Sequence, residues 1–311
     1  MSSFFVHVLL YINVNYNIYM NAIEAKQLTK YYGKHKGIEN LDLVVEQGDF
    51  FGFIGPNGAG KSTTIRTLLG LISPTGGTAT IFDKDIVKDK KEVLKRVGYL
   101  PSEINYYSKM KVKDIIKHSQ GLRGLKDNSK ANSLCERLDL DINKRIDECS
   151  LGNRKKIGVI CAIQHSPDLI ILDEPTSGLD PLMQREFLNI LEEENKRGAT
   201  IFFSSHILQE VQSHCRSAAF IKDGKIIVSD VLENLEEAGA KKVIIRSEVD
   251  MELFNRLLGN MKDLKQDDKQ ISFLFDGDMK RLLAVLAVAE VSDVDIISPS
   301  LEELFMNYYE S

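Results

Sequence analysis

Three short segments of this chain are almost continuously apolar: residues 49–54, 168–172 and 200–203. A run of this length is typical of a strand that is covered on both faces of a sheet. After the first run, apolar residues recur at helical spacing at Ile65, Leu68, Leu69 and Ile72, which predicts an amphipathic helix. A further strand is predicted at residues 77–82. Strands that alternate with helices indicate an α/β fold with a mainly parallel sheet.

Other stretches place further elements around this core. Charged, helix-favouring sequence dominates from about residue 85 to 166 and predicts an inserted helical subdomain. Asp180 and Pro181 together predict a helix start, because an aspartate caps free N–H groups and proline fits the first turn. Residues 20–232 are therefore expected to form one domain.

A smaller unit is expected beyond a boundary near residues 232–239. Strands and helices alternate there, at residues 242–246, 251–261, 271–275 and 279–288. Residues 240–311 therefore predict a small C-terminal α+β accessory domain.

The first residues do not share this organisation. Residues 4–20 are rich in apolar and aromatic side chains, but their longest apolar run is far shorter than the roughly 20 residues of a spanning helix. Organised sequence begins directly after Met20, so residues 1–19 are expected to be an extension or a start-site artefact. No later segment has the length and apolar character to span a bilayer, so work at a membrane would require a partner that crosses it.

Composition narrows the function classes. Hydrophobic residues make up 43% and charged residues 27% of the chain, which is ordinary for a globular protein. The net charge of −5 offers no strongly basic surface, so no nucleic-acid partner is expected. The four cysteines have no metal-ligand spacing and are expected to be buried thiols in a reducing compartment.

A glycine-rich turn after the first apolar run fits the phosphate-loop pattern G-x-x-x-x-G-K-[ST]. Its glycines let backbone N–H groups turn toward phosphate oxygens, and the following helix directs its positive end at the same anions. Lys61 should reach the β- and γ-phosphates of ATP, and the Ser62 hydroxyl should bind Mg²⁺. The predicted nucleotide-binding residues are Gly55, Pro56, Asn57, Gly58, Ala59, Gly60, Lys61, Ser62 and Thr63. A chance glycine turn is disfavoured, since a strand precedes the motif and a helix follows it.

Two acids and a histidine follow the later strands. Asp173 and Glu174 end the run at residues 168–172, and ligands of open α/β sheets bind at the carboxyl ends of strands. Asp173 is expected to hold Mg²⁺ through water, and Glu174 to polarise the water that attacks ATP. His206 follows the next strand and is expected to donate a hydrogen bond to the γ-phosphate. The alternatives are an acidic surface turn and a structural histidine.

The set of motifs resembles the ATP-binding subunit of ABC transporters, over about residues 20–232. The segments that carry the resemblance are the phosphate loop, ECSLGNRKK (148–156), LIILDEP (169–175), SGLD (177–180) and SSH (204–206). The resemblance implies that Tyr32 stacks on adenine, with Tyr31 as the alternative. It also implies that Ser150 and Gly152 bind the γ-phosphate of ATP held by a second copy, and that Asp180 lies at the dimer seam.

The chain departs from this family at two positions. The usual LSGGQ signature is here CSLGN, so Leu151 replaces the first glycine, while the serine and the second glycine remain. The glutamine expected after GYLP is Ser102, whose shorter hydroxyl side chain can still bind metal-bound water. Together with PSEINYY (101–107) and the ending PSLEELFMNYY (299–309), these variants resemble bacterial exporters of the bacitracin-resistance and peptide-antibiotic type, the ABC-2-like subgroup.

The leading hypothesis is therefore an ATPase that powers an exporter from the cytoplasmic face of the cell membrane. Two copies would sandwich two ATP molecules and drive a separate membrane permease, which the helical insert would receive near residues 102–107. An importer ATPase is a near alternative. A soluble ABC ATPase acting on nucleic acid or ribosomes is disfavoured, because about ninety residues without heptads separate loop and signature and the chain has one cassette. A P-loop kinase would not need the signature, SGLD and His206 together.

Overall fold

The computed structural model of the chain describes residues 20–237, 241–246, 254, 256, 258, 261–266, 270–289 and 291–299. The expected extension at residues 1–19 lies outside these residues, as do nearly all of the ending at 299–309 and most of the helix predicted at 251–261.

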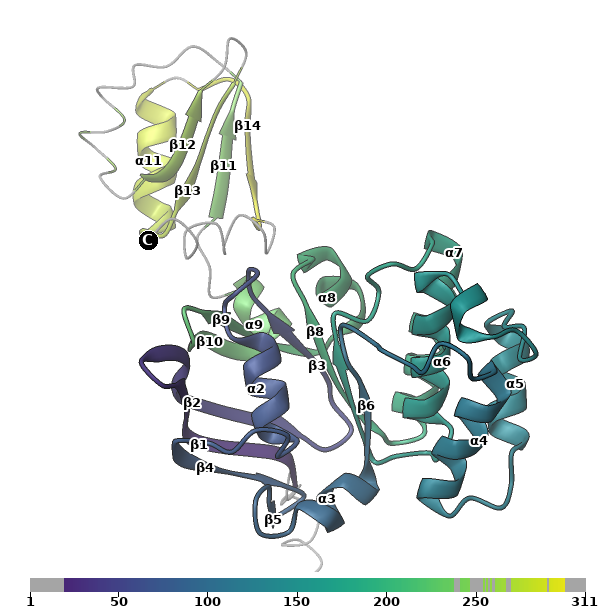
Figure 1. Ribbon diagram of the computed structural model, residues 1–311. Coiled ribbons are helices and arrows are strands. Elements are labelled where there is room, and N and C mark those ends of the chain that lie inside the picture. The colour runs from purple at the N-terminus through teal and green to yellow at the C-terminus, as the bar shows by residue number, and fades with distance from the viewer. Residues whose placement is uncertain are drawn as a thin grey trace, which may run out of the picture.

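The centre of the molecule is a six-stranded sheet in the order β10-β9-β3-β8-β7-β6 (Figure 1). Its strands are β3 (Phe50–Ile54), β6 (Val97–Leu100), β7 (Leu169–Asp173), β8 (Thr200–Ser205), β9 (Ser217–Lys222) and β10 (Lys225–Val231). All neighbouring pairs are parallel except β9 and β10. The predicted mainly parallel sheet is confirmed.

The strands of this sheet are buried on both faces. In β7, Leu169 and Ile171 pack into one hydrophobic cluster, and Ile170 and Leu172 pack into another on the opposite face. Alternate residues of a strand point to opposite faces, so a strand covered on both sides needs apolar residues at every position. This explains the continuous apolar runs in the sequence.

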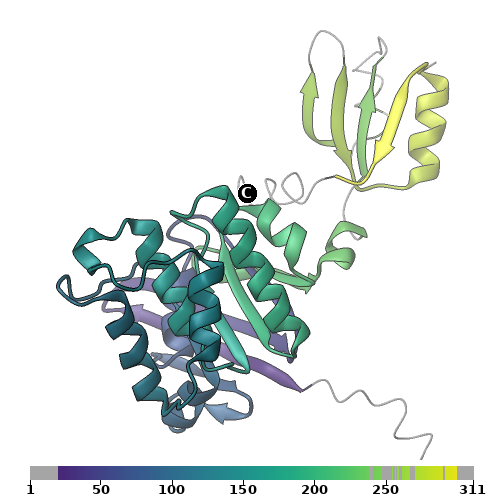
Figure 2. The same ribbon diagram turned by 90° about the vertical axis from the view of Figure 1, so that its right-hand side faces the viewer.

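Helices cover the two faces unequally. On one face α2 (Lys61–Leu68) lies between the central sheet and a second sheet (Figure 1). The other side carries the helical group of α4 (Val112–Arg123), α5 (Ser129–Arg137) and α6 (Leu151–Ile163), with α7 (Pro181–Lys196) and α8 (Leu208–His214) beside it (Figure 2). The carboxylate of Asp180 accepts from the N–H groups of Leu182 and Met183, both at 3.1 Å, so the predicted start of α7 is confirmed.

The second sheet is antiparallel and was largely missed by the sequence analysis. Its order is β2-β1-β4-β5, formed by β1 (Asn21–Tyr32), β2 (His35–Glu46), β4 (Gly76–Ile81) and β5 (Lys84–Asp85). Only β4 was predicted. In β2 the buried residues Leu41, Leu43 and Val45 alternate with exposed ones, which is the pattern of a strand with one face in water. A search for alternation, and not only for continuous apolar runs, would have found it.

The predicted helical insert at residues 85–166 is too wide at its N-terminal end. That range contains α3 (Lys90–Arg96) and β6, and β6 pairs with β7 in the central sheet. The helical group itself begins at Val112. The strand was missed because it has only four residues and contains Gly98, where a Cβ atom would lie 2.0 Å from the carbonyl oxygen of Ala162.

A small α+β unit forms the C-terminal part, as expected. Its antiparallel sheet has the order β12-β13-β11-β14, made of β11 (Lys241–Ile245), β12 (Met261–Gln266), β13 (Ile271–Phe275) and β14 (Val294–Ile297). α11 (Met279–Val288) follows β13, and Val243, Phe254 and Phe273 belong to its separate hydrophobic cluster. This strand order is that of a split β-α-β unit. None of the helices in the described part of the chain is long and apolar enough to cross a membrane.

Candidate nucleotide site

The glycine-rich loop connects the end of β3 to the start of α2. Gly58 has φ +83° and Gly60 has φ +111°, values that residues with a Cβ atom rarely adopt. At Gly55 a Cβ atom would lie 2.3 Å from the carbonyl oxygen of Ile221. Gly60 is also the N-cap of α2, and no side chain accepts from the first N–H groups of that helix. These donors are therefore available to an anion.

Lys61 begins α2 and is only 6% exposed. Its Nζ donates to the carbonyl oxygens of Gly55 at 2.6 Å and Pro56 at 3.2 Å. The same Nζ lies 3.1 Å from Oε1 of Glu174. The ammonium group thus lies inside the curve of the loop and already faces an anion.

Glu174 follows β7 and lies between two cationic or donor groups. One carboxylate oxygen faces Lys61, and the other accepts from Nδ1 of His206, the residue that follows β8. Its backbone has φ +51°, a left-handed conformation that is unfavourable for a glutamate. The Glu174 N–H donates to the carbonyl oxygen and the Oγ of Ser204, both at 3.2 Å, which helps to hold that conformation.

Asp173 is completely buried at the end of β7. Its Oδ1 accepts from Oγ of Ser204 at 3.1 Å, whereas its Oδ2 has no hydrogen-bond partner among the described residues. A buried carboxylate oxygen without a partner fits a site completed by a hydrated cation. The described residues contain no cluster of three or more His, Cys, Asp or Glu that could hold a metal ion. Mg²⁺ is usually bound by one or two carboxylates together with water and substrate phosphates.

A lysine of α6, which was not among the predicted site residues, connects the loop after β6 to this site. Lys155 of α6 donates to the carbonyl oxygens of Ser102 at 3.1 Å and Glu174 at 2.9 Å. Burial lowers the pKa of Lys155 to about 8, although the nearby carboxylates of Asp173 and Glu174 act in the opposite direction. The available signal was a run of three basic residues, 154–156, at the start of an otherwise apolar helix.

The two tyrosines considered for adenine stacking lie in different surroundings. The Tyr31 hydroxyl donates to Oε1 of Glu39 and is thereby engaged. Tyr32 is 45% exposed. A Cβ atom on Gly37 would lie 3.0 Å from the Tyr32 ring and 2.9 Å from Cγ2 of Thr63, so the ring and the end of the loop flank the same glycine.

The signature residues form the exposed start of α6. Ser150 is the N-cap, and its Oγ accepts from the N–H of Asn153 at 3.2 Å. Leu151 is 67% exposed, and Gly152 lies against Gly178 of the SGLD segment, where a Cβ atom would be 3.1 Å from the carbonyl oxygen. Within the described residues neither Ser150 nor Gly152 makes a hydrogen bond to the phosphate loop. Ser150 and Asp180 are exposed, and Gly152 is half-buried.

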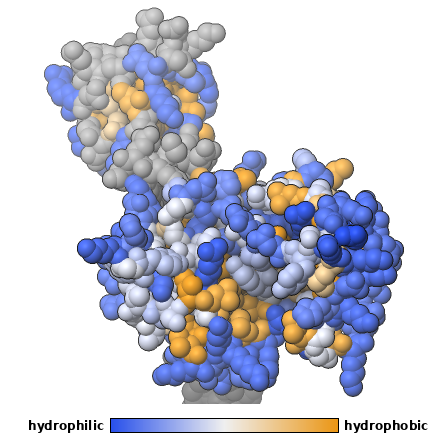
Figure 3. All heavy atoms as spheres, viewed as in Figure 1, coloured by the Kyte–Doolittle hydropathy of each residue, from blue (hydrophilic) through white to orange (hydrophobic). Residues whose placement is uncertain are grey.

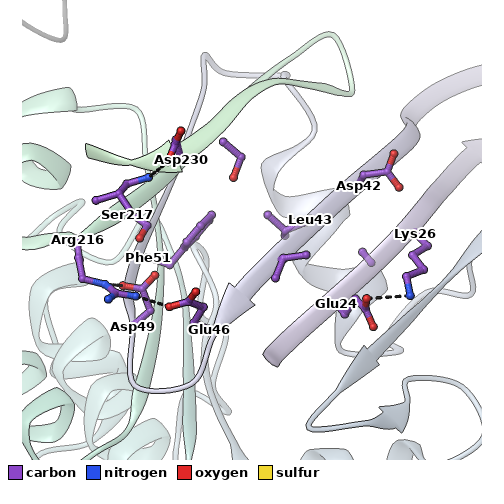
Figure 4. Close-up of a pocket in the computed structure, with 14 residues that line it drawn as sticks. Glu24, Lys26, Asp42, Leu43, Glu46, Asp49, Phe51, Arg216, Ser217 and Asp230 are labelled. Carbon is purple, nitrogen blue, oxygen red and sulfur yellow. Dashed lines mark hydrogen bonds and ion pairs between the residues drawn. The ribbon is translucent and has the colours of Figure 1, made fainter. Parts of the chain in front are cut away.

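A separate cavity lies at the opposite end of β3 and holds none of the predicted site residues. It has a volume of about 540 Å³, and its lining combines apolar side chains with five acidic and two basic ones (Figure 4). Arg216 donates there to Glu46 at 2.6 Å and Asp49 at 3.2 Å, and so ties β9 to the end of β2 and the start of β3. Two of the acidic side chains of this cavity are therefore paired with Arg216 and serve to hold these strands together.

Comparison with known proteins shows clear relatives. The sequence profile "ABC transporter" matches residues 38–177. The bacitracin transport ATP-binding protein BcrA of Bacillus licheniformis is 36% identical over 222 residues, covering 70% of this chain and 72% of that protein. The probable multidrug ABC transporter ATP-binding protein YbhF of Escherichia coli is 33% identical over 223 residues, but the chain spans only 38% of its length. A solved structure described as the ATP-binding subunit of an ABC transporter is 27% identical with a TM-score of 0.66, covering 70% of this chain and 92% of that chain.

Proposed function

This chain belongs to the ABC transporter family as an ATP-hydrolysing subunit, and we propose that it powers export through a separate membrane permease. The proposed cassette is residues 20–232, with residues 240–311 as an accessory domain. The observation that carries the proposal is the convergence of three side chains: Lys61 at the start of α2, and Glu174 and His206 directly after β7 and β8. In an open α/β sheet this edge is where ligands bind.

The proposed roles follow from the contacts of each side chain. Lys61 leaves the carbonyl oxygens of its own loop and neutralises the β- and γ-phosphates. Glu174 accepts a hydrogen bond from the attacking water, while His206 orients the carboxylate and donates to the γ-phosphate. Tyr32 rather than Tyr31 stacks on adenine, because Tyr31 is engaged with Glu39.

The fit of Asp173 to a hydrated cation supports a magnesium site beside the phosphates. Ser62 would bind the ion directly, and Asp173 and Ser102 would hold its water ligands. When bound, Mg²⁺ would supply positive charge that offsets the negative charge developing on the phosphates. Asp173 is already oriented for this role by the hydroxyl of Ser204.

A second copy of the chain completes the proposed site. Ser150 is exposed and Gly152 half-buried at the start of a helix whose N–H groups favour an anion, and among the described residues neither is hydrogen-bonded to the loop of its own chain. Their proposed ligand is the γ-phosphate on the partner copy. Asp180, which caps α7 beside this surface, is assigned to the seam between the two copies.

The permease is proposed to dock in a groove between α3, β6 and α4. This groove has a volume of about 910 Å³, and apolar side chains gather over this part of the face (Figure 3). Tyr106, from the segment after Ser102, lies in it together with the 77% exposed Leu122. Among the described residues that line the groove there is no Asp or Glu. Five of them have basic side chains: Lys91, Lys95, His118, Arg123 and His165. An amphipathic segment with carboxylates on its polar face fits this surface, which would lie at the inner face of the cell membrane.

Export is supported by what the relatives are said to transport: bacitracin for BcrA and, in the probable assignment of YbhF, multiple drugs. The alternative is import. Inside-out membrane vesicles that contain the chain and its permease distinguish the two, because ATP added outside drives export as uptake into the vesicle. Uptake in this orientation is expected, whereas ATP-dependent release of preloaded substrate would indicate import.

The catalytic proposal is tested with Glu174→Gln, which keeps the shape of the side chain and removes its basicity. Turnover should fall by about 10²–10⁴-fold while ATP still binds, because only the water-activating group is lost. Light scattering in saturating ATP should then detect a trapped dimer. Glu136→Gln is the matched control. It makes the same substitution at an exposed glutamate on α5 and should behave as the unaltered chain. Persistent monomers of Glu174→Gln in ATP would contradict the two-copy site.

A further inference from the structure

Lys155 places a buried ammonium group behind the candidate site. It lies in α6, five residues after the Ser150 cap, and is only 3% exposed. Its Nζ donates to the carbonyl oxygen of Glu174 at 2.9 Å and to that of Ser102 at 3.1 Å. One side chain therefore joins α6, the end of β7 and the loop after β6.

These contacts act on a strained residue. Glu174 is held at φ +51°, and a non-glycine residue keeps such a conformation only where its surroundings fix it. Its N–H is fixed by Ser204 on β8, and its carbonyl oxygen is fixed by Lys155 on α6. The direction of the carboxylate between Lys61 and His206 follows from this backbone, so it depends on both anchors.

Burial of the Lys155 ammonium group has a free-energy cost, so a role in packing alone does not explain a lysine at this position. An apolar side chain of similar length would pack in the same place without the cost of removing an ammonium group from water. The ammonium group instead makes charge-assisted hydrogen bonds, which are roughly twice as strong as neutral ones. The carboxylates of Asp173 and Glu174 lie near enough to stabilise it. Its two acceptors are both backbone atoms of predicted site residues.

We propose that Lys155 is a positioning residue for ATP hydrolysis, whose ammonium group fixes the backbone of Glu174 and couples it to α6 and to the Ser102 loop. The inference rests on the proposed function and adds a link inside one copy. Ser150, at the start of the same helix, is about 7.5 Å along the axis from Lys155. A shift of α6 on engagement with the partner's nucleotide moves the Glu174 carbonyl, and the permease-facing loop moves with it.

The experiment compares Lys155→Met with Lys155→Arg in the full-length chain, and Lys156→Met is the matched control. Lys156 is the next residue of α6 and is 9% exposed, so its variant tests a buried methionine in the same helix. Lys155→Met should lower kcat between about tenfold and 100-fold with KM and ATP affinity nearly unchanged, because misplacement of a catalytic group acts on the chemical step. Lys155→Arg should restore part of kcat, because it keeps the charge and its donors.

Hydrogen exchange supplies a readout that does not depend on turnover. In Lys155→Met the amides around residues 101–104 and 173–176 should exchange faster, while Tm stays close to that of Lys156→Met. Equal exchange and equal kcat in the two methionine variants would overturn the proposal, as would a parallel loss of ATP affinity and kcat. If the unaltered chain fails to hydrolyse ATP, the proposed function itself fails, and the exchange result still decides whether Lys155 links the two segments.

Discussion

The side chain of Glu174 shows how much of this site is decided by single residues. It is an acid at the end of a buried strand, with Lys61 on one carboxylate oxygen and His206 on the other. In the proposed site, the phosphates of ATP would therefore compete with Glu174 for Lys61. Loss of the glutamate charge in Glu174→Gln should weaken that competition, which is a second reason to expect retained binding in this variant.

His165 gives a prediction at the same scale. Burial, with Arg123 and Lys130 nearby, lowers its pKa to about 4, and its Nε2 lies 3.3 Å from the Val97 carbonyl oxygen. The unfolded chain takes up this proton near pH 6.5 and the folded chain does not, so stability falls as pH drops from about 6.5 toward 4. The free energy of unfolding should fall by roughly 1–3 kcal/mol over this window from this residue.

Urea unfolding at pH 7 and pH 4.5 measures the effect. His165→Gln should show a smaller difference between the two pH values than the unaltered chain, whereas His118→Gln, an exposed histidine on α4, should leave the difference as it is. A pH response that is identical in all three proteins would contradict the assignment.

At the scale of elements, the proposed docking groove between α3, β6 and α4 allows permease coupling to be tested separately from ATP hydrolysis. Leu122→Asp places a carboxylate on the apolar wall, which repels the carboxylates proposed for the permease segment and removes apolar contact area. The variant should lose permease binding by about tenfold or more, since such changes cost roughly 1–3 kcal/mol. ATP turnover of the isolated chain should not change, because Leu122 is 77% exposed on α4, a helix that carries none of the predicted site residues.

Co-purification with the permease, beside turnover of the isolated chain, checks this prediction. Val87→Asp is the control, since Val87 is also exposed but does not line the groove. Equal permease recovery for both variants would place the docking surface elsewhere.

At the scale of the whole molecule, the site is proposed to be half of a composite. Lys61→Ala removes the phosphate contact of one copy, and Ser150→Phe blocks the surface that one copy offers to the other. Each variant alone should be nearly inactive. In a mixed dimer one site combines an intact loop with an intact signature, so an equimolar mixture should recover up to about a quarter of the unaltered activity.

Titrating one variant into the other at constant total protein gives the recovery curve. Double-variant chains, with both substitutions in the same copy, are the control, because every site in their mixture with either single variant lacks at least one part. Activity that never rises above the sum of the two separate variants would argue for a site complete within one chain.

Local pattern was sufficient for the parts of the fold that repeat over a few residues. Continuous apolar runs predicted β3, β7 and β8, since a strand covered on both faces has no polar positions. The bounds of β13 and α11 were predicted without error. In the sheet β2-β1-β4-β5 every strand except β4 was missed, as was β6, because half-exposed or very short strands carry a weak signal. In the site, sequence motifs predicted Lys61, Asp173 and Glu174, but they did not predict a role for Lys155.

Contacts between distant segments are what the tertiary structure alone decided. The sequence by itself determined that a phosphate loop, two acids and a histidine each follow a buried strand. It did not determine that Lys61 faces Glu174, or that Lys155 reaches Glu174 and Ser102, 19 and 53 residues away. Periodicity reports the environment of one element at a time. A hydrogen bond between two elements depends on how both pack against the sheet, and that relation exists only in the folded chain.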